Sequence, residues 1–485
     1  MTLTQRYLLL LLLPLSLLAE TREIIIFHTT DTHASRRWPQ LATVIKEQLQ
    51  QTPHHLLIDC GDTIQGSPLA TITQGRAAIE PILALPYDVW VPGNHEADFG
   101  VDALKEVFRL AQDKLLCANF RIKTDPHPLP WKIFQRNGLK IAVIGAEASY
   151  FRNWLLPEEF AKYEITTAQQ ALRKQLPLIA REKPDIIILA THQAWFEERD
   201  PRHVNEVREI AEFFPEIHLI IGAHSHREIP GRIIGHNTWY AQAGCHAENL
   251  GKITIRFHEE TRVMDFQSEL IPIPQDTLPD EELLARMQPW LDTEKEYLAI
   301  PTEIVIPKEI PCKLKPGQGN PISELLCMAI AEASGAEIAF HGVLAELPIP
   351  AGPLSRKTLF DVVPYENIII TAELTPDELT AVMTEQWKQR NSYRFCGPWN
   401  ARFLIGSKLH FQGIGFDAPV ENRRYKIAVN SHTAAGSGVF PVLRYILERP
   451  TSNRVNTGIS TRDALEQFLK KHADSLPATK IWLHN

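Results

Sequence analysis

The chain has 485 residues, with 50 basic and 58 acidic side chains and a formal net charge of −8. One hydrophobic core rarely extends over a chain of this length, so two domains are expected. The acidic balance excludes a broad basic face and so argues against a nucleic-acid polymer as the partner.

The first residues are typical of an export signal. Residues 1–6 carry one positive charge, residues 7–18 are almost pure leucine, and Ala19 is a small residue suited to a cleavage site. An apolar run of about a dozen residues is short for a membrane span. We therefore expect a signal peptide at 1–19, a secreted or periplasmic protein, and no membrane span after its removal. An uncleaved N-terminal anchor is the alternative.

Short apolar runs rich in Ile, Val and Leu alternate with helical patterns after this leader. The pattern predicts helices at 101–111 and 167–182, where Pro177 must kink or end the second helix. Buried strands are predicted at 23–29, 55–59, 87–91, 139–145, 185–190 and 218–221, with 251–257 as the closing strand. This alternation indicates an α/β layered domain over residues 22–275.

A proline-punctuated segment follows, and it separates this domain from a second one. Residues 276–300 are expected to be a linker with a charged, mostly solvated helix at 281–297. The second domain, 301–485, contains a helix that Asn320 caps, that Pro321 begins and that Gly335 ends. Strands are predicted at 337–340, 368–374 and 425–429, which favours an α+β fold.

Six cysteines remain, three in each expected domain, and none lies in a C-x-x-C pair, so a thiolate zinc site is not expected. Export permits disulfides. With an odd number per domain, either one thiol stays free in each domain or a bridge crosses between the domains. For Cys60 a buried free thiol is the preferred interpretation.

Five short polar segments carry the chemistry of the sequence, and each follows a predicted strand. The carboxyl ends of strands in an open α/β sheet are where ligands bind, so five loops rich in Asp, His and Asn are expected to meet there. The segments are Asp31-Thr32-His33, Gly61-Asp62, Gly93-Asn94-His95-Glu96, Thr191-His192 and Gly222-Ala223-His224-Ser225-His226.

Each segment taken singly has an ordinary structural explanation, such as turn formation at Asp62 or a hydrogen-bonded core position for His192. Taken together they fit a pair of divalent cations. Residues two apart in extended backbone point the same way, so Asp31 and His33 can reach one ion. Imidazole and carboxylate suit Zn, Mn, Fe or Co, and two such ions can clamp the attacking and departing oxygens of a phosphoryl displacement.

In this order the segments resemble the calcineurin-like metallophosphoesterase superfamily, and specifically its exported 5′-nucleotidase branch, over nearly the whole chain. The resemblance implies a two-layered β-sandwich flanked by helices, followed by an α+β substrate domain. It also implies one metal held by Asp31, His33, Asp62 and His226 and another held by Asp62, Asn94, His192 and His224. Asp62 would then bridge the two ions, and a hydroxide activated by them would attack phosphorus.

The same resemblance gives roles to residues beside the metals. His95 would stabilise the transition state and assist the leaving oxygen, and Asp98 would orient His95. Asp98 could instead cap the helix that begins near Val101. Glu96 is expected to bind backbone rather than to act as a general acid, and His28, His54, His55, His203, His236 and His246 are expected to be solvated or structural.

The second domain departs from the family in detail. Glu346 stands where the family has an arginine for the substrate phosphate, and a carboxylate repels a phosphate. Tyr365 in Pro364-Tyr365-Glu366-Asn367 is a candidate stacking ring, although ordinary core packing is the alternative. Asn367 and His432 are further candidates for substrate binding, and Arg356, Arg394 and Arg402 are possible replacement cations.

The expected function is hydrolysis of nucleotide phosphate esters, with a small phosphate ester as the partner. A cyclic-nucleotide phosphodiesterase and a sulfur-ester hydrolase are alternatives on the same metals. The branch that resembles sulfate thiohydrolases usually lacks the histidine after Gly-Asn, so His95 counts against the latter. A secreted binding protein with vestigial catalysis is the alternative from another functional class.

Overall fold

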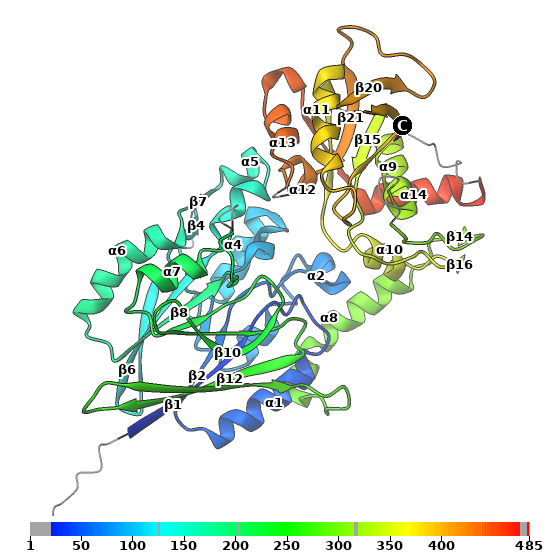
Figure 1. Ribbon diagram of the computed structural model, residues 1–485. Helices are drawn as coiled ribbons and strands as arrows, with labels where there is room; N and C mark the ends of the chain where they lie inside the picture. The colour runs from blue at the N-terminus through cyan, green and yellow to red at the C-terminus, as the bar shows by residue number, and fades with distance from the viewer. Residues whose placement is uncertain are drawn as a thin grey trace, which may run out of the picture.

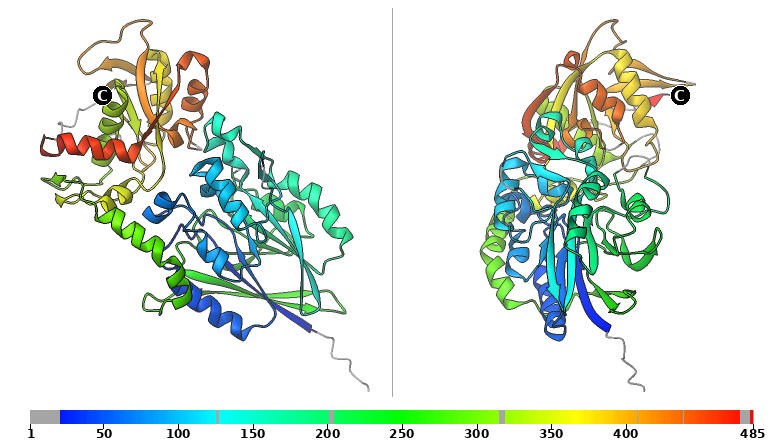
Figure 2. Two further views of the ribbon diagram at one scale, coloured as in Figure 1. Left: turned by 180° about the vertical axis from the view of Figure 1, so that it is seen from behind. Right: turned by 90° about the vertical axis from the view of Figure 1, so that its left-hand side faces the viewer.

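The computed structural model describes residues 21–124, 127–200, 204–314, 319–406, 408–437, 439–475 and 483–484. The expected signal peptide lies outside the described residues. Two bodies follow one another along the chain, and helix α8 (Glu281–Ala299) runs from the first to the second (Figures 1 and 2). Within the described residues, no helix combines the length and apolar character that a membrane span requires.

The first body is built on two sheets, which confirms the predicted β-sandwich. One sheet has the order β13-β12-β1-β2-β3 and the other has the order β10-β11-β9-β8-β6-β5. The first contains β1 (Thr21–Thr29), β2 (His55–Asp59), β3 (Val89–Trp90), β12 (Asn249–His258) and β13 (Met264–Pro272). The second contains β5 (Trp131–Arg136), β6 (Leu139–Glu147), β8 (Ile186–His192), β9 (Leu219–Ile221), β10 (Glu228–Ile234) and β11 (Thr238–Ala243).

Alternation along the strands explains why four layers form. In β1, Ile24 and Ile26 face the core between the sheets, whereas Ile25 and Phe27 face the helices outside. Strand β8 is likewise buried on both faces, as period-two side-chain direction requires of a covered sheet. The outer layers contain α1 (Trp38–Gln51), α2 (Pro68–Thr73), α3 (Glu80–Ala84), α4 (Gly100–Leu110), α5 (Pro157–Phe160), α6 (Ala168–Arg181) and α7 (Val207–Phe213).

The structure excludes one of the two outcomes expected at Pro177 and corrects one strand of this body. Pro177 does not end its helix, because α6 continues to Arg181, so a kink stays a prediction. A proline removes one backbone hydrogen bond, and the buried face of Leu172, Leu176 and Ile179 holds the helix on the sheet. The segment 251–257 is not the closing strand either. It is the middle of β12, and β13 forms the sheet edge beyond it. A short pair, β4 (Phe120–Ile122) and β7 (Tyr163–Ile165), completes the body.

The second body is a mixed sheet of order β18-β15-β21-β17-β22 with helices around it. The predicted helix is α9 (Pro321–Ser334): Asn320 Oδ1 accepts from the Ile322 amide at 2.9 Å, and Gly335 ends the helix with φ of 63°. The strands are β14 (Val305–Ile306), β15 (Ile338–His341), β16 (Gly352–Pro353), β17 (Ile368–Leu374), β18 (Gly397–Trp399), β19 (Ala401–Ile405), β20 (Leu409–Ile414), β21 (Tyr425–Asn430), β22 (Val455–Ser460) and β23 (Leu483–His484). The other helices are α10 (Arg356–Val362), α11 (Pro376–Trp387), α12 (Ser431–Ala434), α13 (Pro441–Leu447) and α14 (Thr461–His472).

Helix α8 is mostly exposed, as expected for a charged linker, but it is also packed against the first body. Leu283 and Met287 enter the core beneath α1, α2 and α3. The buried carboxylate of Glu294 accepts hydrogen bonds from the Leu69 amide at 3.1 Å and from Arg36 Nη2 at 2.8 Å. The linker is therefore fixed to the first body.

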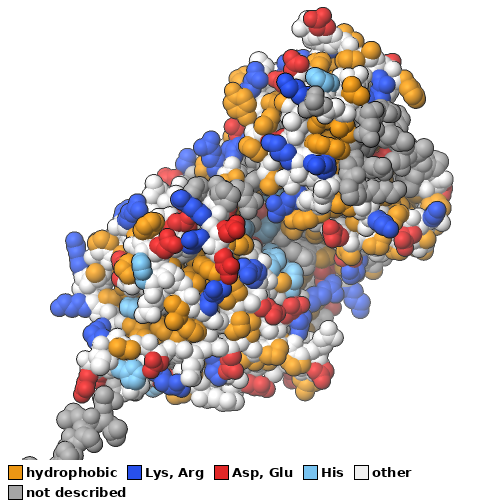
Figure 3. Space-filling model, viewed as in Figure 1, with side chains coloured by type: hydrophobic (Ala, Val, Ile, Leu, Met, Phe, Trp, Pro, Cys, Tyr) orange, Lys and Arg blue, Asp and Glu red, His pale blue; other side chains and the backbone are white. Residues whose placement is uncertain are grey.

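All six cysteines are free thiols, so neither a bridge within a domain nor one between the domains is present. Cys60 is fully buried, as expected, and its Sγ lies 3.6 Å from the Ile221 carbonyl oxygen. On the face drawn in Figure 3, basic and acidic side chains are mixed rather than gathered into one basic surface.

Candidate metal centre and active site

The five polar segments meet at one end of the sandwich, although they come from both sheets. Asp31 follows β1, Asp62 follows β2, and Asn94 and His95 lie on a short 3₁₀ helix, η1 (Asn94–Ala97), after β3. His192 is the last residue of β8, and His224 and His226 follow β9. Strands β1, β2 and β3 are parallel, as are β8 and β9, so their carboxyl ends share one edge.

The candidate ligands form two groups that share Asp62. In the first group, Asp31, His33, Asp62 and His226 place ligand atoms within 4.8 Å of one another. In the second group, Asp62, His192 and His224 do the same. Asn94 belongs beside the second group, because its Oδ1 lies 2.8 Å from His224 Nδ1. This arrangement brings together all seven residues that the sequence singled out.

The donor set fits cations on this structure's own geometry. His192 Nδ1 donates to the Cys60 carbonyl at 2.7 Å, so its Nε2 carries a lone pair when the ring is neutral. That Nε2 is buried without a hydrogen bond among the described residues, although Asp62 Oδ2 lies 3.1 Å away. Likewise His33 Nδ1 donates to the Gln65 carbonyl, and its Nε2 lies 3.0 Å from His226 Nε2. Lone pairs facing one another in this way fit divalent metal ions.

The charges of the buried carboxylates also favour bound cations. Burial, together with the charge of Asp62, raises the pKa of Asp31 to about 7. Burial opposes ionisation of Asp62 as well, but the charges of His192 and His95 outweigh it and hold the pKa of Asp62 well below its usual value. Two carboxylates that are 0% and 2% exposed require positive partners.

The backbone around the candidate ligands is strained. Asp31, His33, Asp62, His224 and His226 all have positive φ, between 50° and 71°. Left-handed conformations cost about 1–3 kcal/mol each for such residues and cluster at functional sites. Two glycines make the close approach possible: a Cβ on Gly61 would lie 2.4 Å from the Gly93 nitrogen, and one on Gly93 would lie 2.3 Å from Asp62 Oδ1.

A buried carboxylate, Glu96, fixes the loop that carries Asp62. Its Oε2 accepts from the Asp62 amide at 3.0 Å, and its Oε1 accepts from the Thr63 amide at 2.7 Å and the Ile64 amide at 3.2 Å. Glu96 also accepts from the Gly93 amide. It binds backbone, as the sequence indicated, and it ties the Asp62 loop to the His95 loop.

His95 and Asp98 are paired beside the second group. His95 Nδ1 lies 2.7 Å from Asp98 Oδ2, and the His95 amide donates to Asp62 Oδ1 at 2.9 Å. Burial lowers the pKa of His95, but Asp98 and Asp62 outweigh it and raise the value to about 9. The capping alternative for Asp98 is wrong, because α4 begins at Gly100 with Phe99 at its N-cap and no side-chain cap.

The second body reaches this centre through Tyr365. Its ring is stacked on His95, with centroids 5.5 Å apart and an interplanar angle of 15°. Gln65 Nε2 donates to the Pro364 carbonyl at 3.0 Å, and Thr71 Oγ1 donates to Glu366 Oε1 at 2.9 Å. Tyr365 is therefore at the domain junction rather than in a core, which removes the core-packing alternative.

The other residues considered for substrate binding differ in their exposure to solvent. His432 is exposed to the junction, yet desolvation by the surrounding protein and the charges of His95 and Arg394 lower its pKa to about 4. Asn367 is buried, and its Oδ1 accepts from Ser431 Oγ at 3.4 Å, so it supports the loop that carries His432. Glu346 is exposed.

Sequence reasoning missed neighbours that no motif marks. Trp154 lies against His224, with ring centroids 5.4 Å apart. His246, expected to be structural, lies 5.4 Å from His33 and 5.9 Å from His226 by ring centroids. Neither residue stands in a recognisable spacing with the five segments, so only the folded chain brings them there.

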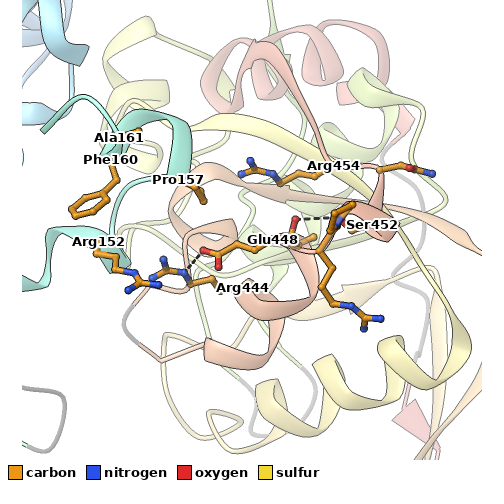
Figure 4. Close-up of a pocket in the computed structure, with 12 residues that line it drawn as sticks. Arg152, Pro157, Phe160, Ala161, Arg444, Glu448, Ser452 and Arg454 are labelled. Atoms are coloured by element: carbon orange, nitrogen blue, oxygen red, sulfur yellow. Dashed lines mark hydrogen bonds and ion pairs between the residues drawn. The ribbon is translucent and has the colours of Figure 1, made fainter.

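A cavity of about 660 Å³ opens between the bodies at a different place (Figure 4). Arg152 comes from the first body, and Arg444, Arg449 and Arg454 come from the second. Arg444 donates to Asn153 Oδ1 at 2.6 Å, and Arg454 donates to Glu158 Oε2 at 2.7 Å. None of the seven candidate ligands lines this cavity, so its arginines connect the two bodies rather than form the metal centre.

Comparison with known proteins agrees with both bodies. Residues 24–228 match the calcineurin-like phosphoesterase family, and residues 302–445 match the 5′-nucleotidase C-terminal domain. The protein UshA of Yersinia enterocolitica is 26% identical, covering 94% of this chain and 92% of that protein.

Solved structures share the whole fold. A 5′-nucleotidase from Staphylococcus aureus, described as putative, superposes with a TM-score of 0.80 at 19% identity, covering 95% of this chain and 99% of that one. The sulfate thiohydrolase SoxB of Thermus thermophilus superposes with a TM-score of 0.65 at 15% identity, covering 92% and 94%. With both bodies matched in order, the chain belongs to the 5′-nucleotidase family of calcineurin-like phosphoesterases and is a metal-dependent phosphoric ester hydrolase.

Proposed function

We propose that this protein is an exported phosphomonoesterase that hydrolyses nucleotides with two divalent metal ions. One observation carries the proposal: two ligand groups share Asp62, and the ring of Tyr365 from the second body lies against His95 beside them. When the two ions at Asp62 bind the phosphate of a nucleotide, the base of that nucleotide would have the planar ring of Tyr365 within reach. Residues 22–275 would form the catalytic domain, 276–300 the linker, and 301–485 the substrate domain, with 1–19 removed on export.

In this proposal the candidate ligands bind two ions that share Asp62. One ion would be held by Asp62 together with Asp31, His33 and His226. The other would be held by Asp62 together with Asn94, His192 and His224. Two divalent ions there would polarise the phosphate and make water a better nucleophile. The metal-binding atoms are oriented before substrate arrives. Glu96 fixes the Asp62 loop, and the hydrogen bonds of His192 and His33 fix the direction of each imidazole ring.

His95 is the proposed catalytic residue beyond the ligands. Burial opposes the imidazolium form of His95, but Asp98 and Asp62 raise the pKa and favour that form. An imidazolium can neutralise charge on the phosphate and give a proton to the leaving oxygen. Asp98 is a positioning residue, because it holds Nδ1 and leaves Nε2 to the substrate.

Recognition of the nucleoside is assigned to Tyr365 and His432, with Asn367 supporting the His432 loop. Arg394 is the proposed cation in place of the arginine that Glu346 replaces, because it is near enough to His432 for its charge to lower the pKa of that ring. Arg394 lies over the Tyr393 ring just as Arg356 lies over the Tyr297 ring. Arg402 donates to the Gln412 and Asp417 carbonyls, so nearness to His432 rather than a free guanidinium selects Arg394.

The experiment is a substrate panel on the full mature chain with Mn²⁺ or Co²⁺. p-Nitrophenyl phosphate should be hydrolysed, chelation should abolish turnover, and 5′-nucleotides should be preferred over 3′-, 2′,3′-cyclic and sugar-linked ones. A metal-loaded chain that is inert toward monoesters and diesters would instead support the binding-protein alternative.

A sulfur-ester hydrolase is the second candidate, because SoxB shares the fold. His95 argues against it, since a protonated imidazole suits a poor alkoxide leaving group. Release of sulfate from a sulfur ester, with no phosphatase activity, would reverse this choice.

A further inference from the structure

A second cluster of metal-ligating side chains lies at the solvent side of the centre. His226, Cys245 and His246 place ligand atoms within 4.8 Å of one another, and we call these three residues the rim site. His226 belongs to the first group as well. Its side chain is 42% exposed whereas Asp31 is 0% exposed, so the shared residue stands between solvent and the buried ligands.

The loop that carries Cys245 and His246 is fixed to the loop that carries Asp31 and His33. The His246 amide donates to the Asp31 carbonyl at 2.8 Å, and Ser35 Oγ donates to the His246 carbonyl at 2.8 Å. His246 and Ala247 both have positive φ, 54° and 58°, so the turn is held in a conformation that ordinary residues avoid. These contacts keep the rim site beside the first group.

The donor set of the rim site differs from that of the buried centre. A thiol and two imidazoles favour zinc and cobalt over magnesium or calcium, whereas the buried groups add carboxylates and an amide. Three protein ligands leave at least one coordination position to solvent, which suits an ion in transit.

We propose that the rim site captures a zinc-class divalent ion and passes it inward to Asp31, His33 and Asp62, with His226 remaining bound throughout. This inference rests on the dinuclear centre proposed above. The shared ligand lets the ion exchange Cys245 and His246 for the three buried ligands without full release. Cys245 gives up its thiol proton when the ion arrives and takes one back when the ion moves inward.

The test follows cobalt loading of the metal-free mature chain by rapid mixing. Thiolate bound to Co²⁺ gives a charge-transfer absorption band that oxygen and nitrogen ligands do not give. Wild type should show this band transiently, before the final spectrum of two bound ions. Cys245→Ser should lack the band and load about tenfold more slowly, yet reach the same final cobalt content. Cys312→Ser, at another half-buried thiol, is the matched control and should behave as wild type.

A second variant arrests the ion at the rim. His33→Asn removes a buried ligand but keeps a residue type that tolerates the positive φ of 50°. In this variant the thiolate band should persist, and it should vanish in His33→Asn/Cys245→Ser.

Two results overturn the inference. One is a wild type that binds two cobalt ions without a thiolate band and loads as fast as Cys245→Ser. The other is a band that persists in saturated wild type, because the thiolate would then be a permanent ligand. A chain that binds no cobalt at all would overturn the proposed dinuclear centre itself.

Discussion

The two bodies of this molecule treat their functional residues very differently. In the first body all seven candidate ligands are present, and five of them are held in left-handed backbone. In the second body Glu346, which the family resemblance aligns with a substrate-binding arginine, is exposed, and so is His432. The difference teaches that metal coordination fixes donor type and direction, whereas recognition of a nucleoside can be assembled from different side chains.

The contrast predicts which kinetic constant each body controls. Changes in the first body should lower kcat for every phosphate ester, including p-nitrophenyl phosphate, which has no base. Changes in the second body should raise KM for nucleotides alone.

The largest effect is expected from loss of the shared ligand. Asp62→Asn should reduce turnover of all substrates by roughly a thousandfold or more, because metal polarisation supplies several kcal/mol. Metal analysis should show fewer than two bound ions. Retention of both ions with full turnover would mean that Asp62 does not bridge them.

His95→Ala should come next, with a loss of kcat of about 10²–10⁴-fold, the usual range for a general acid. Bound metal should be unchanged, because His95 is outside both ligand groups. The measurement is kcat for a nucleotide and for p-nitrophenyl phosphate. The loss should be larger for the nucleotide, because its alkoxide leaving group needs the proton more than p-nitrophenolate does. An equal loss for both esters would contradict proton donation by His95.

Asp98→Asn should shift the pH profile. The carboxylate raises the pKa of His95, so the imidazolium form, and the activity that needs it, is present below that pKa and is lost as pH rises through it. The amide removes this attraction, and the alkaline limb of kcat should move to lower pH, by about one unit for each 1.4 kcal/mol lost. A shift to higher pH would contradict the assigned role.

Tyr365→Ala tests the junction. Stacking of a base on an aromatic ring contributes about 1–3 kcal/mol, so KM for nucleotides should rise about 5- to 150-fold. Tyr365→Phe is the control and should retain most affinity. An equal change for p-nitrophenyl phosphate would show that the ring supports His95 rather than a base.

Glu346→Arg should give the smallest effect, a few-fold lower KM for 5′-nucleotides, because a guanidinium replaces a repelling carboxylate. The control is Glu346→Gln, which removes only the repulsion. A weaker affinity in Glu346→Arg would show that Glu346 does not occupy the family's arginine position.

Elements of both bodies were predictable where their sequence signals are local. Strand β2 and helix α9 have the predicted bounds and caps, since buried apolar runs and an Asn-Pro start leave few alternatives. The seven ligands were expected to meet because they lie at or just past the ends of predicted strands, and parallel strands end at one edge. Their division between two ions was implied by the family resemblance.

What could not be predicted depends on tertiary contacts. Strand β13 is an edge with an alternating half-exposed pattern, which carries a weak signal. The helix α6 continues past Pro177 because packing outweighs one lost hydrogen bond. Cys245 and His246 lie between β11 and β12 without any motif, and contacts of His246 with Asp31 and Ser35, far away in the sequence, bring them to the centre.

The close contact between Gly61 and Gly93 limits which mutations this site can accept during evolution. Gly61 and Gly93 touch through backbone, and a methyl group on either one would strike the other loop or Asp62. Neither position takes part in chemistry, yet no single replacement can be accepted at either without displacing the bridging carboxylate. Stepwise mutation can therefore change exposed side chains of the second body, whereas the two glycines beside the candidate ligands offer no tolerated intermediate sequences.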